Sequence, residues 1–213
     1  MEKETLVIVD VQFGFCNKKG GLYVKNGEKI ITPIANYIKK NHKKIDQVIF
    51  TLDWHPYEEE SYKEPNITWP MHCMQFSEDA AIPNKLIKTC LNNDVKFTFF
   101  PKGNCSKIDY FMDHFHTEYG AFEKIDIYKD KVMLCNRRED AIINLNTTIL
   151  VVCGIAGDYC VLNTIKNILK SNSDYSASDD VALKVKVFKD GIVSIDDGKT
   201  LNDFIEQNKL EIV

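Results

Sequence analysis

Residues 149–160 read ILVVCGIAGDYC, a wholly apolar run that leads through a glycine-rich turn to a cysteine. The apolar residues Val161, Ile165, Ile168 and Leu169 then recur at helical spacing. A strand without polar positions is typical of one that is covered on both faces, as strands of parallel sheets are. This stretch therefore predicts an α/β fold in which a buried strand, a turn and an amphipathic helix that begins near Tyr159 follow one another.

The same alternation of short apolar runs and helix-periodic segments continues along the chain. Such alternation predicts a parallel sheet with right-handed crossovers and helices on both faces. We expect a single three-layer α/β/α domain over residues 1–213, with a mostly parallel, roughly six-stranded sheet of the Rossmann-like kind. The expected strands are Leu6–Val9, Val48–Leu52, Val95–Phe100, Ile149–Val152, Val185–Phe188 and Leu210–Val213.

The composition excludes several classes of partner. The 213 residues carry a net charge of −4, and Arg137 and Arg138 are the only arginines, which argues against a nucleic-acid binder. No apolar stretch approaches the roughly 18 residues of a membrane span. The 7 cysteines are an odd number without a C-x-x-C pair, a pattern typical of reduced thiols. We expect a cytoplasmic protein with a small-molecule partner, no nucleic acid and no membrane.

Polar residues mark the ends of four expected strands. Asp10 and Asp53 end the first two strands, Lys102 follows the third strand by one residue, and Cys160 follows the fourth after a short turn. Ligands of an open parallel sheet bind beyond the carboxyl ends of its strands. We therefore expect these four residues to meet at one site, whereas any one of them alone is more often a cap or turn residue.

Cys160 is the strongest candidate nucleophile. In a first helical turn it would face the positive end of the helix dipole, which lowers the pKa of a thiol. Exposed backbone N–H groups of the same turn can hold an oxyanion. Asp10 is suited to act as the base, and Lys102 would balance the charges of the carboxylate and the thiolate.

A second cluster combines Asp53 and His55 with His72. Two imidazoles and a carboxylate, with open positions left over, are typical of catalytic sites for zinc, iron or manganese. The alternative is that His55 lies in a surface turn and never meets His72.

Six segments, in order and at characteristic spacing, carry a family resemblance. They are Val9–Cys16 with Gly20-Gly21, Asp53–Pro56, Trp69–Cys73, Lys102-Gly103, Tyr119–Phe122 and Gly154–Cys160. On these segments the chain resembles the nicotinamidases of the isochorismatase-like cysteine hydrolase superfamily, from Leu6 to about Lys170.

The resemblance implies a role for each matching residue. Asp10, Lys102 and Cys160 would form the catalytic triad, and the backbone N–H groups of Ala156 and Cys160 the oxyanion hole, beside a cis Ile155–Ala156 peptide. One divalent ion would be held by Asp53, His55 and His72, with zinc favoured over iron or manganese. The substrate-binding aromatic residues would be Phe15, Trp69, Tyr119 and Tyr159. The implied reaction is hydrolysis of nicotinamide to nicotinate in NAD salvage, with pyrazinamide as a second substrate.

Several points depart from the family pattern or stay open. Gly14 and Gly157 stand where related proteins commonly have Asp and Thr. A fourth metal ligand could be Glu59 or Glu64, and the insertion 104–118 could be a lid or a contact in a homo-oligomer. The competing hypotheses for function are another amide hydrolase of the superfamily, a non-catalytic metal-binding member, and a redox sensor that works through Cys160.

Overall fold

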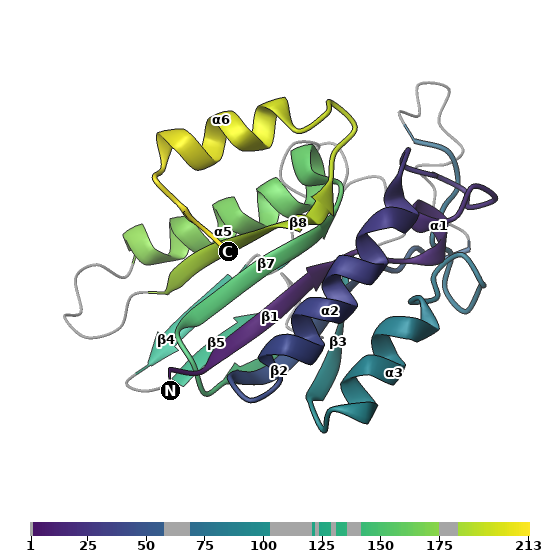
Figure 1. Cartoon of the computed structure of the whole chain (residues 1–213). Coiled ribbons are helices and arrows are strands. Elements are labelled where there is room, and N and C mark those ends of the chain that lie inside the picture. The colour runs from purple at the N-terminus through teal and green to yellow at the C-terminus, as the bar shows by residue number, and fades with distance from the viewer. Residues whose placement is uncertain are drawn as a thin grey trace.

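A single six-stranded parallel sheet forms the centre of the protein, in the order β3-β2-β1-β7-β8-β9 (Figure 1). The computed structural model describes residues 2–57, 69–102, 121, 124–128, 131–135, 142–174 and 183–213. The predicted α/β class and the parallel sheet are confirmed, and each of the six expected strands is present with somewhat different ends.

The helices and strands follow in chain order. They are β1 Glu4–Val9, α1 Phe13–Cys16, a 3₁₀ turn Gly27–Ile30, α2 Ile31–Asn41, β2 Ile45–Asp53, α3 Asn84–Asn92, β3 Lys96–Lys102, β4 Lys124–Tyr128, β5 Lys131–Cys135, β6 Ile142–Leu145, β7 Ile149–Ile155, a π-helical turn Gly157–Val161, α5 Leu162–Asp174, β8 Lys184–Val193, α6 Lys199–Gln207 and β9 Glu211–Ile212. None of the described helices is long and apolar enough to cross a membrane.

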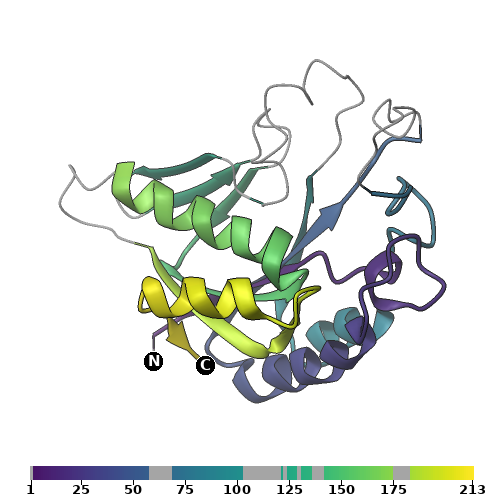
Figure 2. The ribbon, with the colours of Figure 1, turned by 90° about the horizontal axis from the view of Figure 1, so that it is seen from above.

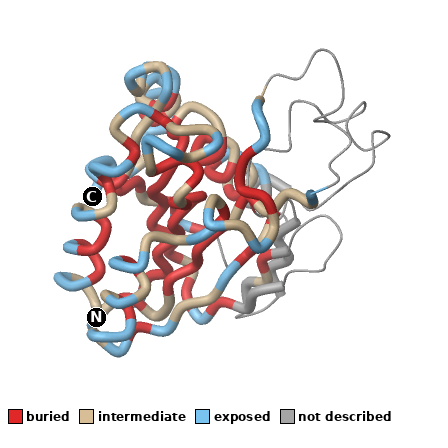
Figure 3. The backbone as a smooth tube through the Cα atoms, turned by 90° about the vertical axis from the view of Figure 1, so that its right-hand side faces the viewer, coloured by how far each residue is buried: buried red, intermediate tan, exposed pale blue. Residues whose placement is uncertain are grey.

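Helices cover the sheet on both faces. Helices α2 and α3 lie on one face, and α5 and α6 lie on the other (Figure 2). Alternate residues of β1 enter opposite cores: Leu6 and Ile8 pack toward α2, whereas Val7 and Val9 pack toward α5. Every residue of β1 and β7 is buried, and burial concentrates in the strands and inner helix faces (Figure 3). The strands whose predicted runs contain no polar residue are thus the strands that helices cover on both faces.

A second sheet was not predicted. Strands β4, β5 and β6 form a three-stranded antiparallel sheet, and Leu134 and Leu145 of this sheet join the core beneath α5. These strands have only four or five residues each. Runs that short carry too few repeats for a period to be recognised.

The order in which strands are added to the sheet changes direction between β1 and β7. From β1 the sheet extends through β2 to β3 on one side, and β7, β8 and β9 extend it on the other. Such a reversal opens a crevice at the carboxyl ends of the two central strands, where ligands of these sheets bind. Gly154 sits beside Val9 with φ +132°, and a Cβ there would overlap the Val9 backbone. This close approach places Asp10 and the turn before Cys160 at the same edge.

Candidate active site

The structure brings Asp10, Lys102 and Cys160 together at that edge. Lys102 Nζ lies 2.9 Å from Asp10 Oδ2 and 3.8 Å from Cys160 Sγ. All three residues are buried, with exposed fractions of 0%, 6% and 7% in that order. Lys102 is the last residue of β3 rather than the residue after it, and it pairs in register with Asp53 of β2. Two strand ends, those of β1 and β3, and one turn therefore supply a single buried cluster.

The two carboxylate oxygens of Asp10 differ in their hydrogen bonding. Its Oδ1 accepts a hydrogen bond of 2.6 Å from the Thr51 hydroxyl, whose oxygen in turn accepts the Asp10 backbone N–H at 3.1 Å. Asp10 adopts φ 50°, a left-handed conformation that costs energy for a residue other than glycine. Among the described residues, Asp10 Oδ2 has the ion pair with Lys102 but no well-directed hydrogen bond. That oxygen is the one available to take a proton.

The electrostatics of the cluster differ from the sequence-based expectation. Burial raises the pKa of the Cys160 thiol, Lys102 opposes this, and the carboxylates of Asp10 and Asp53 reinforce it, so that the pKa lies well above its usual value. The predicted lowering of this pKa by a helix terminus was wrong. Cys160 lies in a π-helical turn ahead of α5, where burial and two carboxylates outweigh a dipole.

The partners of Cys160 are shifted as well. Burial raises the pKa of Asp10, although Lys102 works against the rise. Burial alone would lower the pKa of Lys102, but Asp10 and Asp53 raise it well above its ordinary value, so Lys102 stays a cation. One fixed cation thus faces two groups, Asp10 and Cys160, whose pKa values are both raised.

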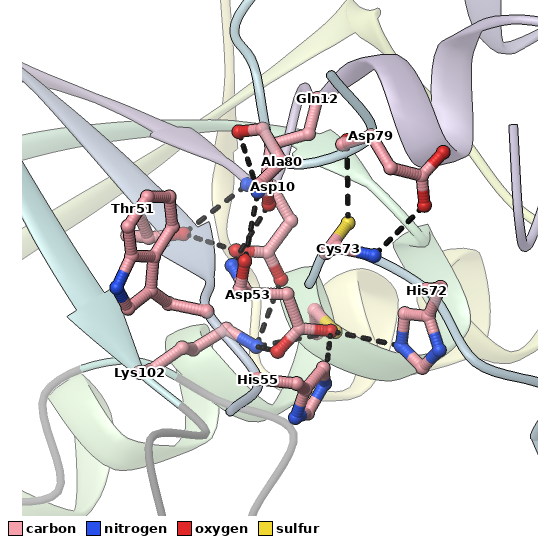
Figure 4. Close-up of polar contacts among 12 residues, drawn as sticks. Asp10, Gln12, Thr51, Asp53, His55, His72, Cys73, Asp79, Ala80 and Lys102 are labelled. Atoms are coloured by element: carbon pink, nitrogen blue, oxygen red, sulfur yellow. Dashed lines mark hydrogen bonds and ion pairs between the residues drawn. The ribbon is translucent and has the colours of Figure 1, made fainter. Parts of the chain in front are cut away.

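Asp53, His55 and His72 form the candidate metal centre. Nε2 of His55 and Nε2 of His72 lie 3.4 Å and 3.2 Å from Asp53 Oδ2 (Figure 4). One ligand atom from each residue lies within 4.8 Å of the others. Ligands bound to zinc at ~2.0–2.1 Å in a tetrahedron are separated by roughly 3.3 Å. The three side chains therefore fit a divalent ion, and the alternative in which the histidines never meet was wrong.

The groups around this triad orient it. His72 Nδ1 lies 2.6 Å from the Pro70 carbonyl oxygen, so Nδ1 donates and Nε2 is left as the ligand atom. Burial alone would raise the pKa of Asp53, but Lys102 and His55 lower it well below its usual value. Asp53 is consequently an anion, as a metal ligand must be.

Gln12 lies in the segment Val9–Cys16, for which the sequence predicts no role at this position, and the structure reveals one. The side chain is fully buried and holds Asp53 at both ends of its backbone: Oε1 accepts the Asp53 N–H, and Nε2 donates to the Asp53 carbonyl, each at 2.8 Å. Nε2 also donates to the Ala80 carbonyl at 3.0 Å (Figure 4). No periodicity or spacing could have indicated these contacts, because their partners lie 41 and 68 residues away.

Three of the four expected substrate-binding aromatic residues lie beside the two triads. The Phe15 ring meets the His72 ring edge-on at 5.4 Å, and the Trp69 ring meets the Tyr159 ring at 5.3 Å. The Trp69–Tyr159 contact joins the loop of His72 to the turn of Cys160. Tyr119, the alternative metal ligands Glu59 and Glu64, and the insertion 104–118 lie outside the described residues.

The turn around Cys160 has the expected backbone features. The Ile155–Ala156 peptide bond is cis, as the resemblance implied. A Cβ on Gly157 would overlap the Ser194 hydroxyl, so the space that a side chain would need there is filled from β8 and its following loop. Thr164 donates to the Cys160 carbonyl at 2.7 Å and accepts the Ala121 N–H at 2.9 Å. The turn is therefore braced from two sides.

Comparison with known proteins agrees with this geometry. No family model matches the chain. The nicotinamidase of Saccharomyces cerevisiae is 24% identical over 185 residues, which cover 76% of this chain and 79% of that protein. A crystal structure of the yeast nicotinamidase bound to the inhibitor nicotinaldehyde superposes with a TM-score of 0.68 at 20% identity, covering 99% of both chains. The pyrazinamidase of Pyrococcus horikoshii in complex with zinc gives a TM-score of 0.67 at 25% identity, covering 99% of this chain and 98% of that one.

Fold and site together are those of an α/β hydrolase that resembles the isochorismatase-like proteins. The curated relatives of this chain make the resemblance more specific. The chain is similar to the nicotinamidases: three curated members are 24%, 25% and 28% identical to it.

Proposed function

We propose that this protein is a metal-containing cysteine amidohydrolase that converts nicotinamide and water to nicotinate and ammonia. The observation that carries the proposal is the position of Lys102, whose Nζ contacts Asp10, Asp53 and Cys160. It joins a potential base and nucleophile to a carboxylate that also belongs to the metal-binding triad. A buried cluster with this composition is costly to maintain without a function.

The proposed reaction runs through a thioester. Asp10 takes the proton of Cys160 as the sulfur attacks the carboxamide carbon, and the backbone N–H groups of Ala156 and Cys160 stabilise the oxyanion that forms. Asp10 returns the proton to the departing nitrogen, which leaves as ammonia. Asp10 then takes a proton from water as the water oxygen attacks the thioester carbon, and it passes this proton to the departing sulfur. This restores the thiol, and the acid that is released ionises to nicotinate.

Lys102 lowers the electrostatic cost of proton transfer between Cys160 and Asp10. With Lys102 as a cation, the pair Asp10 and Cys160 needs to carry only one negative charge at a time, and moving the proton between them leaves the total charge unchanged. The raised pKa of the thiol means that Cys160 rests as a thiol and is deprotonated during attack.

Asp53, His55 and His72 would hold one divalent ion, for which we propose zinc. When bound, the ion supplies a positive site that orients the ring nitrogen of the substrate. Phe15, Trp69, Tyr119 and Tyr159 would contact the ring. The zinc-containing pyrazinamidase among the structural relatives supports both zinc and pyrazinamide as a second substrate. We further propose a single catalytic domain that acts in NAD salvage in the cytoplasm.

Ammonia release from nicotinamide by the purified protein, before and after chelation and after return of Zn²⁺, tests the proposal. We expect steady release by the untreated protein and recovery of release when Zn²⁺ is returned. No release from nicotinamide or pyrazinamide by the metal-loaded protein would contradict the proposal and favour a non-catalytic metal-binding protein. Release from other amides alone would favour another amide hydrolase of the superfamily.

A further inference from the structure

Asp79 lies in the segment between β2 and α3, and its carboxylate joins two parts of the chain. Oδ1 accepts the backbone N–H of Gly21 at 3.0 Å. Oδ2 accepts the backbone N–H of Cys73 at 2.8 Å (Figure 4). The backbone carbonyl of Asp79 accepts the N–H of Gly14 at 2.7 Å. Asp79 thus connects the segment after β1 to the residue that directly follows the candidate ligand His72.

Two glycines leave the room that this carboxylate occupies. A Cβ on Gly14 would lie 2.7 Å from Asp79 Oδ2, and a Cβ on Gly21 would lie 2.9 Å from the same oxygen. Both distances are too short for a carbon atom beside an oxygen. Any side chain at either glycine would therefore push Asp79 away from the Cys73 N–H.

Cys73, the residue that Asp79 holds, is linked to both histidines of the candidate metal centre. Cys73 has φ 45°, a left-handed conformation that its neighbours must maintain. Its N–H belongs to the peptide bond that leaves His72, and its carbonyl accepts the N–H of His55 at 3.2 Å. A shift of Cys73 would consequently move His72 directly and His55 through one hydrogen bond.

We propose that Asp79 is a positioning residue of the metal centre: its carboxylate fixes the Cys73 peptide and thereby the spacing of His55 and His72. This inference rests on the proposed metal site but does not depend on which amide is hydrolysed. Removal of partners outside the ligand set commonly weakens metal binding by ~10–100-fold. We expect Asp79→Ala to weaken binding of Zn²⁺ by at least ~10-fold, within that range.

Competition between the full-length protein and a chromogenic chelator for Zn²⁺ tests the inference. Asp79→Asn is the second variant, because its amide oxygen can accept only one of the two N–H groups and the packing volume is kept; we expect an intermediate affinity. Glu78→Ala is the matched control, since Glu78 is the exposed neighbour and the variant loses the same charge one residue away. We expect Glu78→Ala to bind Zn²⁺ as the unchanged protein does.

Two further measurements separate positioning from general destabilisation and from failure of the proposed function. In chelator, the urea midpoint of Asp79→Asn should stay close to that of Glu78→Ala while its Zn²⁺ affinity differs. Equal Zn²⁺ affinity in Asp79→Ala, Asp79→Asn and Glu78→Ala would overturn the positioning role. If the unchanged protein binds Zn²⁺ tightly with this dependence on Asp79 but releases no ammonia from nicotinamide, only the proposed reaction fails.

Discussion

Lys102 Nζ lies 3.0 Å from Asp53 Oδ1, while the other oxygen of the same carboxylate, Oδ2, faces the two histidines. One carboxylate therefore serves the lysine of the reactive cluster and the candidate metal centre at once. Loss of a charge beside one oxygen of this carboxylate changes the electrostatic potential at the other oxygen, because the carboxylate is buried and its charge is poorly screened. A change of charge at Lys102 therefore acts on the candidate metal centre as well as on the reactive cluster.

Cys160→Ala should abolish hydrolysis and leave the fold intact, because only the atom that forms the covalent bond is removed. We expect kcat to fall below about 1% of the original value, a loss of more than ~2.7 kcal/mol in transition-state stabilisation. Initial rates of ammonia release measure this loss. Cys90→Ala, in a buried position on α3, is the control and should keep its activity. Near-normal turnover by Cys160→Ala would assign the nucleophile elsewhere.

Substitutions at Asp10 and Lys102 should move the titration of Cys160 in opposite directions. The charge of Asp10 raises the pKa of the thiol and that of Lys102 lowers it. Asp10→Asn should therefore make Cys160 react with an alkylating agent at lower pH, and Lys102→Met at higher pH. The unchanged, chelated protein should titrate above the free-cysteine value of about 8.5.

Alkylation rates against pH, read on the Cys160 peptide by mass spectrometry, decide these shifts. The thiol of Cys90, whose pKa burial raises to about 11, provides an internal reference that neither substitution should move. Shifts of the same sign in both variants, or no shift in either, would rule out the charge balance described above. Both variants should also lose activity, although Asp10→Asn makes the thiol easier to ionise.

His55→Ala or His72→Ala should remove the bound metal and weaken substrate binding while the Cys160 thiol remains reactive. Each substitution deletes one of the three ligand atoms that the described residues offer, so the loss should exceed the ~10–100-fold typical of groups outside the ligand set. Elemental analysis of purified protein gives the metal content. His42→Ala is the control, because His42 lies just after α2, away from the site, and its Nδ1 contacts the local Lys39 carbonyl. Full metal content in both ligand variants would exclude this metal centre.

Gln12→Ala should lower the free energy of unfolding by about 3 kcal/mol. The substitution removes the hydrogen bonds to the Asp53 N–H and to the carbonyls of Asp53 and Ala80, all in a buried site. Urea denaturation of the chelated protein measures the loss. Gln75→Ala is the comparison, since Gln75 donates one half-buried hydrogen bond of 3.2 Å to the Trp54 carbonyl and its loss should cost about 1 kcal/mol. Equal destabilisation of the two variants would contradict a special role for Gln12.

Local patterns in the sequence were enough to predict the main sheet and the strand ends. The continuous apolar runs of β1 and β7 reflect burial on both faces, which is a property of each strand and its immediate covering. Asp10, Asp53 and Lys102 stand at or just beyond their strand ends, and a parallel sheet gathers such ends at one edge. Fold class and the membership of the reactive cluster could therefore be inferred from the chain alone.

Only the tertiary structure decided how those residues behave. The pKa of Cys160 rises because burial and two carboxylates outweigh one lysine, a balance that depends on distances between four separate segments. The contacts of Gln12 and Asp79 with backbone groups up to 68 residues away leave no trace in local spacing. Hydrogen bonds need a donor and an acceptor within roughly 3 Å, and charge interactions depend on the distance between the groups, so both are set by the way the segments pack and not by their order along the chain.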